Sequence, residues 1–223
     1  MTSFKLVTLL LLLLTGCELS AADPATSNAA AQKRGRIVIL GDSITAGYGV
    51  DPAQAYPALL QQKINAAGLP FNVVNAGVSG DTTAGGLRRV DWALSKGADV
   101  LIVALGGNDG LRGVPPKQTA ANLDGIIKRA RAKIPSLAVI VAGMQMPANF
   151  GREFVDEYKA VFPRVAAENN AELVPFLLEG VAGVENLNQP DRIHPTDEGH
   201  KRIAENVWPV LQKLLAKQAV VSK

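Results

Sequence analysis

The chain has 223 residues, of which 48% are hydrophobic and 19% charged, a balance typical of a soluble globular protein with one core. The formal net charge is only +3, and the basic residues are scattered apart from two short clusters, residues 33–36 and the pair Arg88–Arg89. With 5% aromatic residues, this composition argues against a nucleic-acid-binding surface, which needs concentrated positive charge and aromatic rings for base stacking.

The first 16 residues have the pattern of a signal peptide. One lysine precedes an apolar run over residues 6–14, which is too short to cross a bilayer because a membrane helix needs about 20 residues. The letters LTGC that close this run resemble the lipobox of bacterial lipoproteins, in which the chain is cut before the cysteine and the cysteine is acylated. We therefore expect a lipoprotein-type signal peptide over residues 1–16 and lipidation of Cys17, with an ordinary secretory signal cut near Ala21 or Ala22 as the alternative.

Residues 17–34 are small and polar and show no apolar periodicity, which predicts a flexible tether before a folded domain at residues 35–218. Cys17 is the only cysteine, so the chain offers neither a disulfide nor a thiolate zinc site. We expect an exported bacterial protein. A lipid anchor would hold it on a membrane, on the side that faces the periplasm or the cell exterior, or else the protein is soluble in the periplasm.

Five short runs rich in valine, isoleucine and leucine follow the tether. Such runs are typical of strands buried on both faces of a parallel sheet. They cover residues 36–40, 71–75, 99–105, 137–143 and 171–176. Helical segments lie between them, so the sequence predicts an α/β domain with a doubly wound, five-stranded parallel sheet and right-handed crossovers.

Three of the intervening segments carry apolar residues at helical spacing, which predicts helices with one buried face. The three sets are Leu60, Ile64 and Ala67, then Leu123, Ile126, Ile127 and Ala130, and finally Ile203, Val207, Val210, Leu211 and Leu214. The last of these helices is predicted to begin after Pro195, with Thr196 or Asp197 as its cap and acidic residues in its first turn.

Polar residues follow four of the predicted strands. Ser43 comes just after the first strand, residues 75–77 end the second, and residues 106–109 end the third. The segment MQMPANFG at residues 144–151 follows the fourth, where we expect it to form a pocket wall. Because ligands of such sheets bind beyond the carboxyl ends of the strands, these segments are predicted to share one site.

The chain has only two histidines, and one of them stands beside an aspartate. His194 lies in a loop before the last helix, with Asp191 three residues upstream and Pro195 directly behind it. A carboxylate at this spacing fixes the imidazole tautomer and stabilises the imidazolium formed in catalysis, although Asp191 capping a turn is the plain structural alternative. His200 is expected inside the helix as a packing or surface residue.

Ser43 is either the N-cap of a helix or a nucleophile that uses the helix start. Backbone N–H groups and the dipole at a helix start stabilise the oxyanion that forms when a serine attacks a carbonyl. Gly77 offers a backbone N–H that a substrate oxygen can approach, and Asn108 offers a side-chain amide, although both residues also suit ordinary turns.

Four blocks of the sequence resemble those of the SGNH, or GDSL, hydrolases. The blocks are GDSI at 41–44, NAGVSGDT at 75–82, GGNDGLRG at 106–113 and DRIHPTDEGH at 191–200, in the order of the family. The resemblance covers residues 36–214 and is closest to the bacterial periplasmic thioesterase/lysophospholipase and arylesterase branch. It implies a flavodoxin-like three-layer α/β/α sandwich with a five-stranded parallel sheet, and neither a cofactor nor a metal ion.

The resemblance also implies a role for each motif residue. Ser43 would be the nucleophile and His194 the base that Asp191 orients, while the Ser43 N–H, Gly77 and Asn108 would form the oxyanion hole. Further residues near these blocks are candidates for substrate binding. They are Asp42, Gly107, Met144, Met146, Pro147 and Ile193.

The predicted function is that of a serine esterase that cleaves aryl esters and short to medium acyl esters, with thioesters and lysophospholipids as further substrates. A carbohydrate O-deacetylase of the same fold and a non-catalytic, lipid-anchored binding protein are the alternatives. The glycine-rich segments lack the Gly-Lys-Ser/Thr ending of a phosphate-binding loop, and no protein partner is predicted.

Overall fold

The computed structural model describes residues 34–221 and contains one sheet in this range. Its strands are β1 (Gly35–Gly41), β2 (Phe71–Gly77), β3 (Val100–Ala104), β4 (Ala138–Ala142) and β5 (Glu172–Val174). They lie in the order β2-β1-β3-β4-β5, and every neighbouring pair is parallel. This order is that of flavodoxin-like folds, so the predicted fold class is confirmed.

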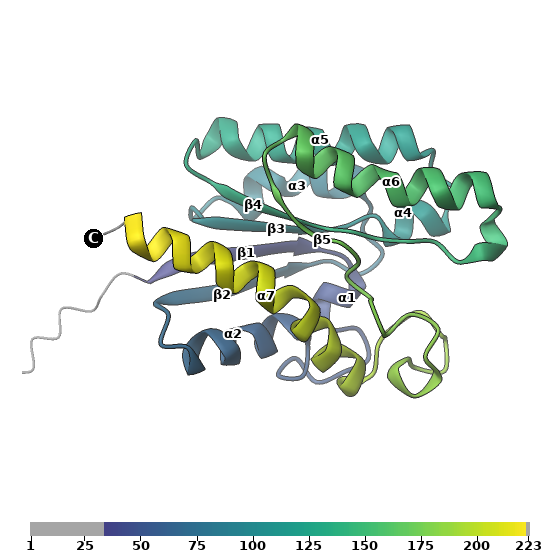
Figure 1. Ribbon diagram of the computed structural model, residues 1–223, viewed down its shortest axis with the longest axis horizontal. Coiled ribbons are helices and arrows are strands. Elements are labelled where there is room, and N and C mark those ends of the chain that lie inside the picture. Colours follow the sequence, from purple (N-terminus) through teal and green to yellow (C-terminus); the bar gives the residue numbers. More distant parts are fainter. Residues whose placement is uncertain (1–33, 222–223) are drawn as a thin grey trace, which may run out of the picture. The chain divides into compact units, whose positions relative to one another are not determined.

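Helices cover both faces of the sheet and complete the three layers (Figure 1). One face carries α2 (Tyr56–Ala66) and α7 (Asp197–Val221), and the other carries α3 (Thr83–Ala93), α5 (Pro116–Lys133) and α6 (Arg152–Glu168). The short helices α1 (Ser43–Ala46) and α4 (Gly107–Leu111) follow β1 and β3, and single 3₁₀ turns span Ala148–Phe150 and Glu185–Leu187.

The central strands β1, β3 and β4 form the centre of the core because their branched side chains are buried on both faces, whereas the edge strands β2 and β5 are only partly buried. Ile37 and Leu40 of β1 and Leu101 and Val103 of β3 are fully buried. The predicted helical stripes fall on α2, α5 and α7, with one correction. Ala67 is exposed, because α2 ends at Ala66.

The start of α7 agrees with the first of the two caps predicted for this helix, Thr196 rather than Asp197. The Thr196 hydroxyl accepts a hydrogen bond from the Gly199 N–H at 3.3 Å. In residues 34–221, no helix is both long and apolar enough to span a membrane. The predicted signal peptide, the lipidation site Cys17 and the tether up to residue 33 lie outside the described residues.

The carboxyl ends of β1 and of its two neighbours, β2 and β3, are level with one another. In the parallel register, Gly41 of β1 pairs with Gly77 of β2 on one side and with Ala104 of β3 on the other. The residues that follow these strand ends therefore meet at one edge of the sheet, and that edge carries the polar motifs of the sequence.

Candidate active site

Ser43 is the first residue of α1, but it is not the cap of that helix. The cap is Asp42, whose Oδ1 atom accepts a hydrogen bond from the Ile44 N–H at 3.0 Å. This leaves the Ser43 side chain free for other partners. The turn between β1 and α1 is tight, because a Cβ atom at Gly41 would lie only 1.9 Å from the Thr45 hydroxyl oxygen.

Ser43, His194 and Asp191 form one hydrogen-bonded row. The Ser43 Oγ lies 2.9 Å from His194 Nε2, and His194 Nδ1 lies 2.6 Å from Asp191 Oδ2. Because an ionised carboxylate only accepts hydrogen bonds, Asp191 places the imidazole proton on Nδ1 and leaves Nε2 to accept the proton of Ser43. The row joins residues 151 positions apart in the chain.

Asp191 is kept ionised by the loop around it. Its Oδ1 atom accepts hydrogen bonds from the backbone N–H groups of Ile193, at 2.9 Å, and His194, at 3.0 Å. The backbone bond from His194, followed by the bond to its side chain, lowers the pKa of the Asp191 carboxyl to about 2. The carboxylate is therefore charged at every pH at which the protein would work.

The loop that carries His194 is fastened at both ends. The backbone N–H of Gln189 donates to the His194 carbonyl at 2.7 Å, and the Gln189 side chain donates to the carbonyls of Tyr48 and Pro195. The Tyr48 ring also packs against the imidazole, with ring centroids 4.5 Å apart. These contacts restrict the ring of His194 to one orientation.

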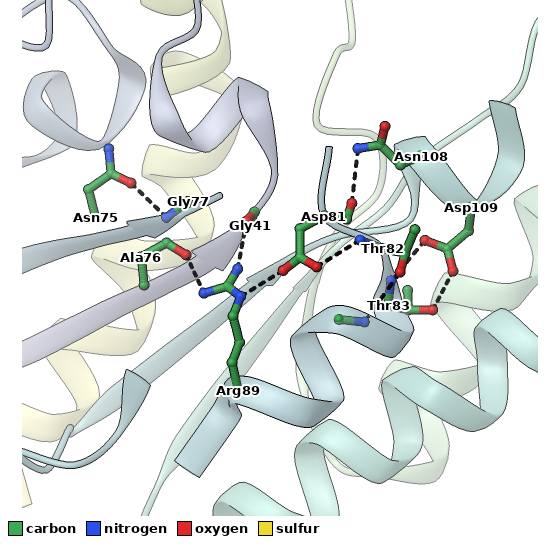
Figure 2. A network of polar contacts seen from close by, with 11 residues as sticks. Gly41, Asn75, Ala76, Gly77, Asp81, Thr82, Thr83, Arg89, Asn108 and Asp109 are labelled. Atoms are coloured by element: carbon green, nitrogen blue, oxygen red, sulfur yellow. Dashed lines mark hydrogen bonds and ion pairs between the residues drawn. The ribbon is translucent and has the colours of Figure 1, made fainter. Parts of the chain in front are cut away.

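Asn108 lies at the start of α4 and points toward the loop after β2. Its Nδ2 atom donates to the Asp81 carbonyl at 2.9 Å, as Figure 2 shows, which orients the amide and leaves its second hydrogen without a partner among the described residues. The N–H of Ser43 is likewise unpaired within residues 34–221. Both groups are available as donors to a ligand.

The backbone N–H of Gly77 is already paired, which differs from its predicted role as an oxyanion-hole donor. Its N–H donates to the Asn75 side chain at 2.9 Å, and Figure 2 shows this pair on the opposite side of Arg89 from Asn108. A Cβ atom at Gly77 would lie 2.3 Å from the Ala46 nitrogen, so glycine is needed here for α1 to pack on β2. The structure therefore does not offer the Gly77 N–H to a ligand, because the neighbouring amide side chain already uses it.

Gly80, three residues further on, has the properties that Gly77 lacks. It lies in the loop beyond the sheet edge with φ +77°, and its N–H has no partner among the described residues. Its carbonyl accepts a hydrogen bond from Arg112 at 3.0 Å, and the next residue, Asp81, is the one that binds Asn108. No signal in the sequence separates the two glycines, because the choice depends on the Asn75 side chain that takes the Gly77 N–H.

An apolar cavity of about 420 Å³ lies beside this site. Five of the six predicted substrate-binding residues line it, namely Gly107, Met144, Met146, Pro147 and Ile193. Residues that the sequence analysis did not single out complete the wall, among them Ile44, Leu111, Phe176, Leu178 and Arg192. They come from segments far apart in the chain, so no local pattern marked them.

Asp42 is the predicted substrate-binding residue that does not line the cavity. Its side chain is buried, and burial raises the pKa of its carboxyl to about 6, partly offset by the bond from Ile44 and by His194. Asp42 thus supports the turn that carries Ser43. No group of three or more His, Cys, Asp and Glu side chains within residues 34–221 is arranged to hold a metal ion.

His200 packs inside the fold and does not lie at the surface. Its Nδ1 atom accepts a hydrogen bond from the Tyr56 N–H at 3.2 Å, and its ring stacks on that of Tyr56. Burial lowers the pKa of His200 to about 4, against the opposing effect of Asp197. The neutral form is required, since a protonated Nδ1 would place two donors face to face.

This burial makes stability depend on pH. Between pH 6.5 and 4 the unfolded chain binds a proton at His200 that the folded chain does not, so the free energy of unfolding falls by up to about 3 kcal/mol as pH decreases through this range. Urea unfolding at pH 7, 5.5 and 4.5 measures the fall, and His200→Gln should reduce it, because glutamine does not titrate and can accept the Tyr56 N–H. An equal fall in both proteins would contradict the assignment.

The fold and this row of side chains together define a class. A flavodoxin-like parallel sheet that presents serine, histidine and aspartate in hydrogen-bonded order at its carboxyl edge is the framework of a serine hydrolase. Residues 39–202 match the family described as GDSL-like lipase/acylhydrolase, and the chain belongs to that family. The prediction of a serine hydrolase that acts on ester bonds is confirmed.

Two named proteins are similar to this chain over most of its length. Esterase TesA of Pseudomonas aeruginosa is 44% identical over 205 residues, which cover 92% of this chain and 98% of that protein. A protein of Escherichia coli K12 named thioesterase 1/protease 1/lysophospholipase L1 is 37% identical over 180 residues, covering 80% and 84%. A crystal structure of TesA matches with a TM-score of 0.77 at 42% identity, covering 80% of this chain and 99% of that one.

Proposed function

We propose that the protein hydrolyses carboxylic esters through an acyl-enzyme, with Ser43 as nucleophile, His194 as general base and Asp191 as the residue that orients His194. The observation that carries this proposal is the row of two hydrogen bonds, 2.9 Å from Ser43 to His194 and 2.6 Å from His194 to Asp191. Nucleophile, base and orienting group are each within the reach that such catalysis needs.

The reaction proceeds in two steps that share the same groups. Ser43 Oγ attacks the ester carbonyl while His194 Nε2 takes its proton, and His194 then gives that proton to the leaving alcohol as the carbon–oxygen bond breaks. In the second step water attacks the acyl-Ser43 ester while His194 takes its proton, and His194 then returns that proton to Ser43 Oγ as the acyl–oxygen bond breaks and the acid leaves. Asp191 stabilises the imidazolium in both steps without taking up the proton.

We assign the oxyanion hole to the Ser43 N–H, the Asn108 amide and the Gly80 N–H, with Gly80 in place of Gly77. The N–H groups of Ser43 and Gly80 and the second amide hydrogen of Asn108 lack a partner among the described residues, and the bond from Asn108 to the Asp81 carbonyl joins two of the segments that carry them. Donors that are held in place before the reaction need no reorganisation when charge develops on the carbonyl oxygen.

The cavity points to esters with an apolar acyl or aryl group. Its walls are formed by Ile44, Leu111, Met144 and Met146, and Ile193 stands half-exposed beside His194. The names of the relatives, esterase and thioesterase/lysophospholipase, agree with such substrates. Because each methylene in an apolar pocket contributes only about 1–3 kcal/mol of discrimination, we propose a broad range of acyl groups that includes thioesters and lysophospholipids.

Two measurements test the function. The protein should react covalently at Ser43 with a fluorophosphonate probe, and it should hydrolyse p-nitrophenyl esters over a range of lengths within a series from C2 to C16. An acyl-CoA and a lysophospholipid extend the series. Activity confined to acetyl esters would instead support the carbohydrate O-deacetylase, and failure to label at Ser43 would support a binding protein without catalysis.

We further propose that the protein is exported and held on a membrane surface by a lipid on Cys17. The LTGC pattern at the end of the apolar run supports this proposal. Labelling of cells with a radioactive fatty acid should mark the protein and not its Cys17→Ser variant, and an unlabelled natural protein would disprove the anchor.

A further inference from the structure

Arg89 of α3 makes three hydrogen bonds to the ends of β1 and β2 and to the loop after β2 (Figure 2). Its Nε atom donates to the Asp81 carboxylate at 2.6 Å, and its two Nη atoms donate to the carbonyls of Ala76 and Gly41, each at 2.8 Å. The arginine side chain is only 18% exposed and that of Asp81 10%, so solvent screens this cluster weakly.

The three acceptors belong to the segments that carry the reactive groups. Gly41 ends β1, two residues before Ser43, and its carbonyl also accepts the N–H of Val78 from the loop after β2. Ala76 is the penultimate residue of β2. Asp81 is in the same loop and directly follows Gly80. One guanidinium therefore connects the end of the nucleophile's strand with the loop that carries Gly80.

Asp81 extends this connection to Asn108. One of its carboxylate oxygens binds Arg89 and the other accepts the Thr82 N–H at 3.0 Å, while its main-chain carbonyl accepts the Asn108 amide at 2.9 Å. The carbonyl that orients Asn108 thus belongs to the residue that Arg89 holds. A shift of this peptide would shift the amide with it.

We propose that Arg89 is a positioning residue for the oxyanion hole. Its planar fork sets the spacing between β1 and the loop after β2, and it fixes the Asn108 amide through Asp81, without touching the substrate. This inference rests on the function proposed above for Asn108. Lysine cannot take the role, because a single ammonium on a flexible stem does not reproduce a rigid fork directed at three acceptors.

A double-mutant cycle between Arg89 and Asn108 tests the proposal. Asn108→Ala should lower kcat by about 10²–10³-fold, the loss expected for one oxyanion donor. Arg89→Ala should lower kcat by about 10- to 100-fold, with KM within about threefold, because small misplacements of reacting groups have effects of this size. The double variant should lose clearly less than the product of the two single losses, since part of the effect of Arg89 is exerted through a group that is already missing.

A purely structural role predicts a different pattern. If Arg89 only stabilises the fold, kcat of the folded Arg89→Ala protein stays near the natural value, or the two losses multiply in the double variant, and either result overturns the proposal. Arg89→Lys keeps the charge and serves if Arg89→Ala does not fold. It should retain the kcat deficit with an unchanged KM, and full activity in Arg89→Lys would equally overturn the proposal.

Arg88→Ala is the matched control. Arg88 is the adjacent arginine of α3, is exposed, and makes no polar contact among the described residues, so its loss should leave kcat and KM unchanged. If the proposed function itself is wrong, Ser43→Ala or Asn108→Ala will remain active in a chain that still has Arg89. That result is distinct from any result obtained with the Arg89 variants. Failure of the present proposal leaves those two single losses intact.

Discussion

Ser43→Ala should lower kcat on p-nitrophenyl butyrate by about 10⁶-fold, the size of loss seen when the serine of a catalytic triad is removed. The variant lacks the only atom that can form the acyl-enzyme, whereas the cavity and the oxyanion donors stay in place. Substrate binding should therefore change little. The fold should also be preserved, because the Ser43 hydroxyl makes its hydrogen bond to His194 and Asp42 caps α1.

The measurement is a steady-state assay at high enzyme concentration, together with thermal melting followed by circular dichroism. Ser95→Ala is the matched control, because Ser95 is an exposed serine beyond the end of α3 and at a distance in sequence from every site residue. A Ser43→Ala protein that kept even a few per cent of the natural kcat would show that another group is the nucleophile.

Asp191→Asn should lower kcat by about 10⁴-fold, because the substitution selects the wrong imidazole tautomer. Asparagine can keep its carbonyl oxygen toward the N–H groups of Ile193 and His194, so the loop conformation is retained. Its amide nitrogen then faces His194 Nδ1 and donates to it. The ring proton moves to Nε2, where it prevents His194 from accepting the proton of Ser43.

The substitution should lower kcat and leave KM nearly constant. Steady-state kinetics from pH 6 to 9 measure both constants. Asp156→Asn on α6 is the control, since Asp156 is an exposed aspartate whose partner Arg152 lies on the same helix. If Asp191→Asn retained more than a tenth of the natural kcat, Asp191 would be a turn residue only, the structural alternative that its spacing allowed.

The sheet could be predicted because its signal is local. A strand buried on both faces needs a continuous apolar run, and each of the five runs became a strand in parallel register. The contact between Asp191 and His194 is also local, since three residues separate them in one loop. These features follow from side-chain chemistry over a few positions, which a sequence displays directly.

Gly77 and Gly80 illustrate where such reasoning stops. Both are glycines of one short motif, and both fit a role as backbone donors. The choice between them depends on the Asn75 side chain, which takes the Gly77 N–H while its own amide binds the Thr45 carbonyl of α1. That competition involves two elements 30 residues apart, and no spacing in the sequence expresses it.

The amino-acid order was sufficient for the α/β class, through its periodicity, and for Ser43, Asp191 and His194 as candidates, through short motifs. The flavodoxin-like fold and the ester-hydrolase chemistry followed from the resemblance of those motifs to the SGNH hydrolases. The tertiary structure decided which backbone and amide donors are free to bind a ligand, and that Asp42 and not Ser43 caps α1. It also decided that Arg89, one of two adjacent arginines for which the sequence suggested no role, connects two strand ends and a loop. The reason is physical: a hydrogen-bonding group has one set of partners, and only the folded chain determines which groups arrive within 3 Å of one another.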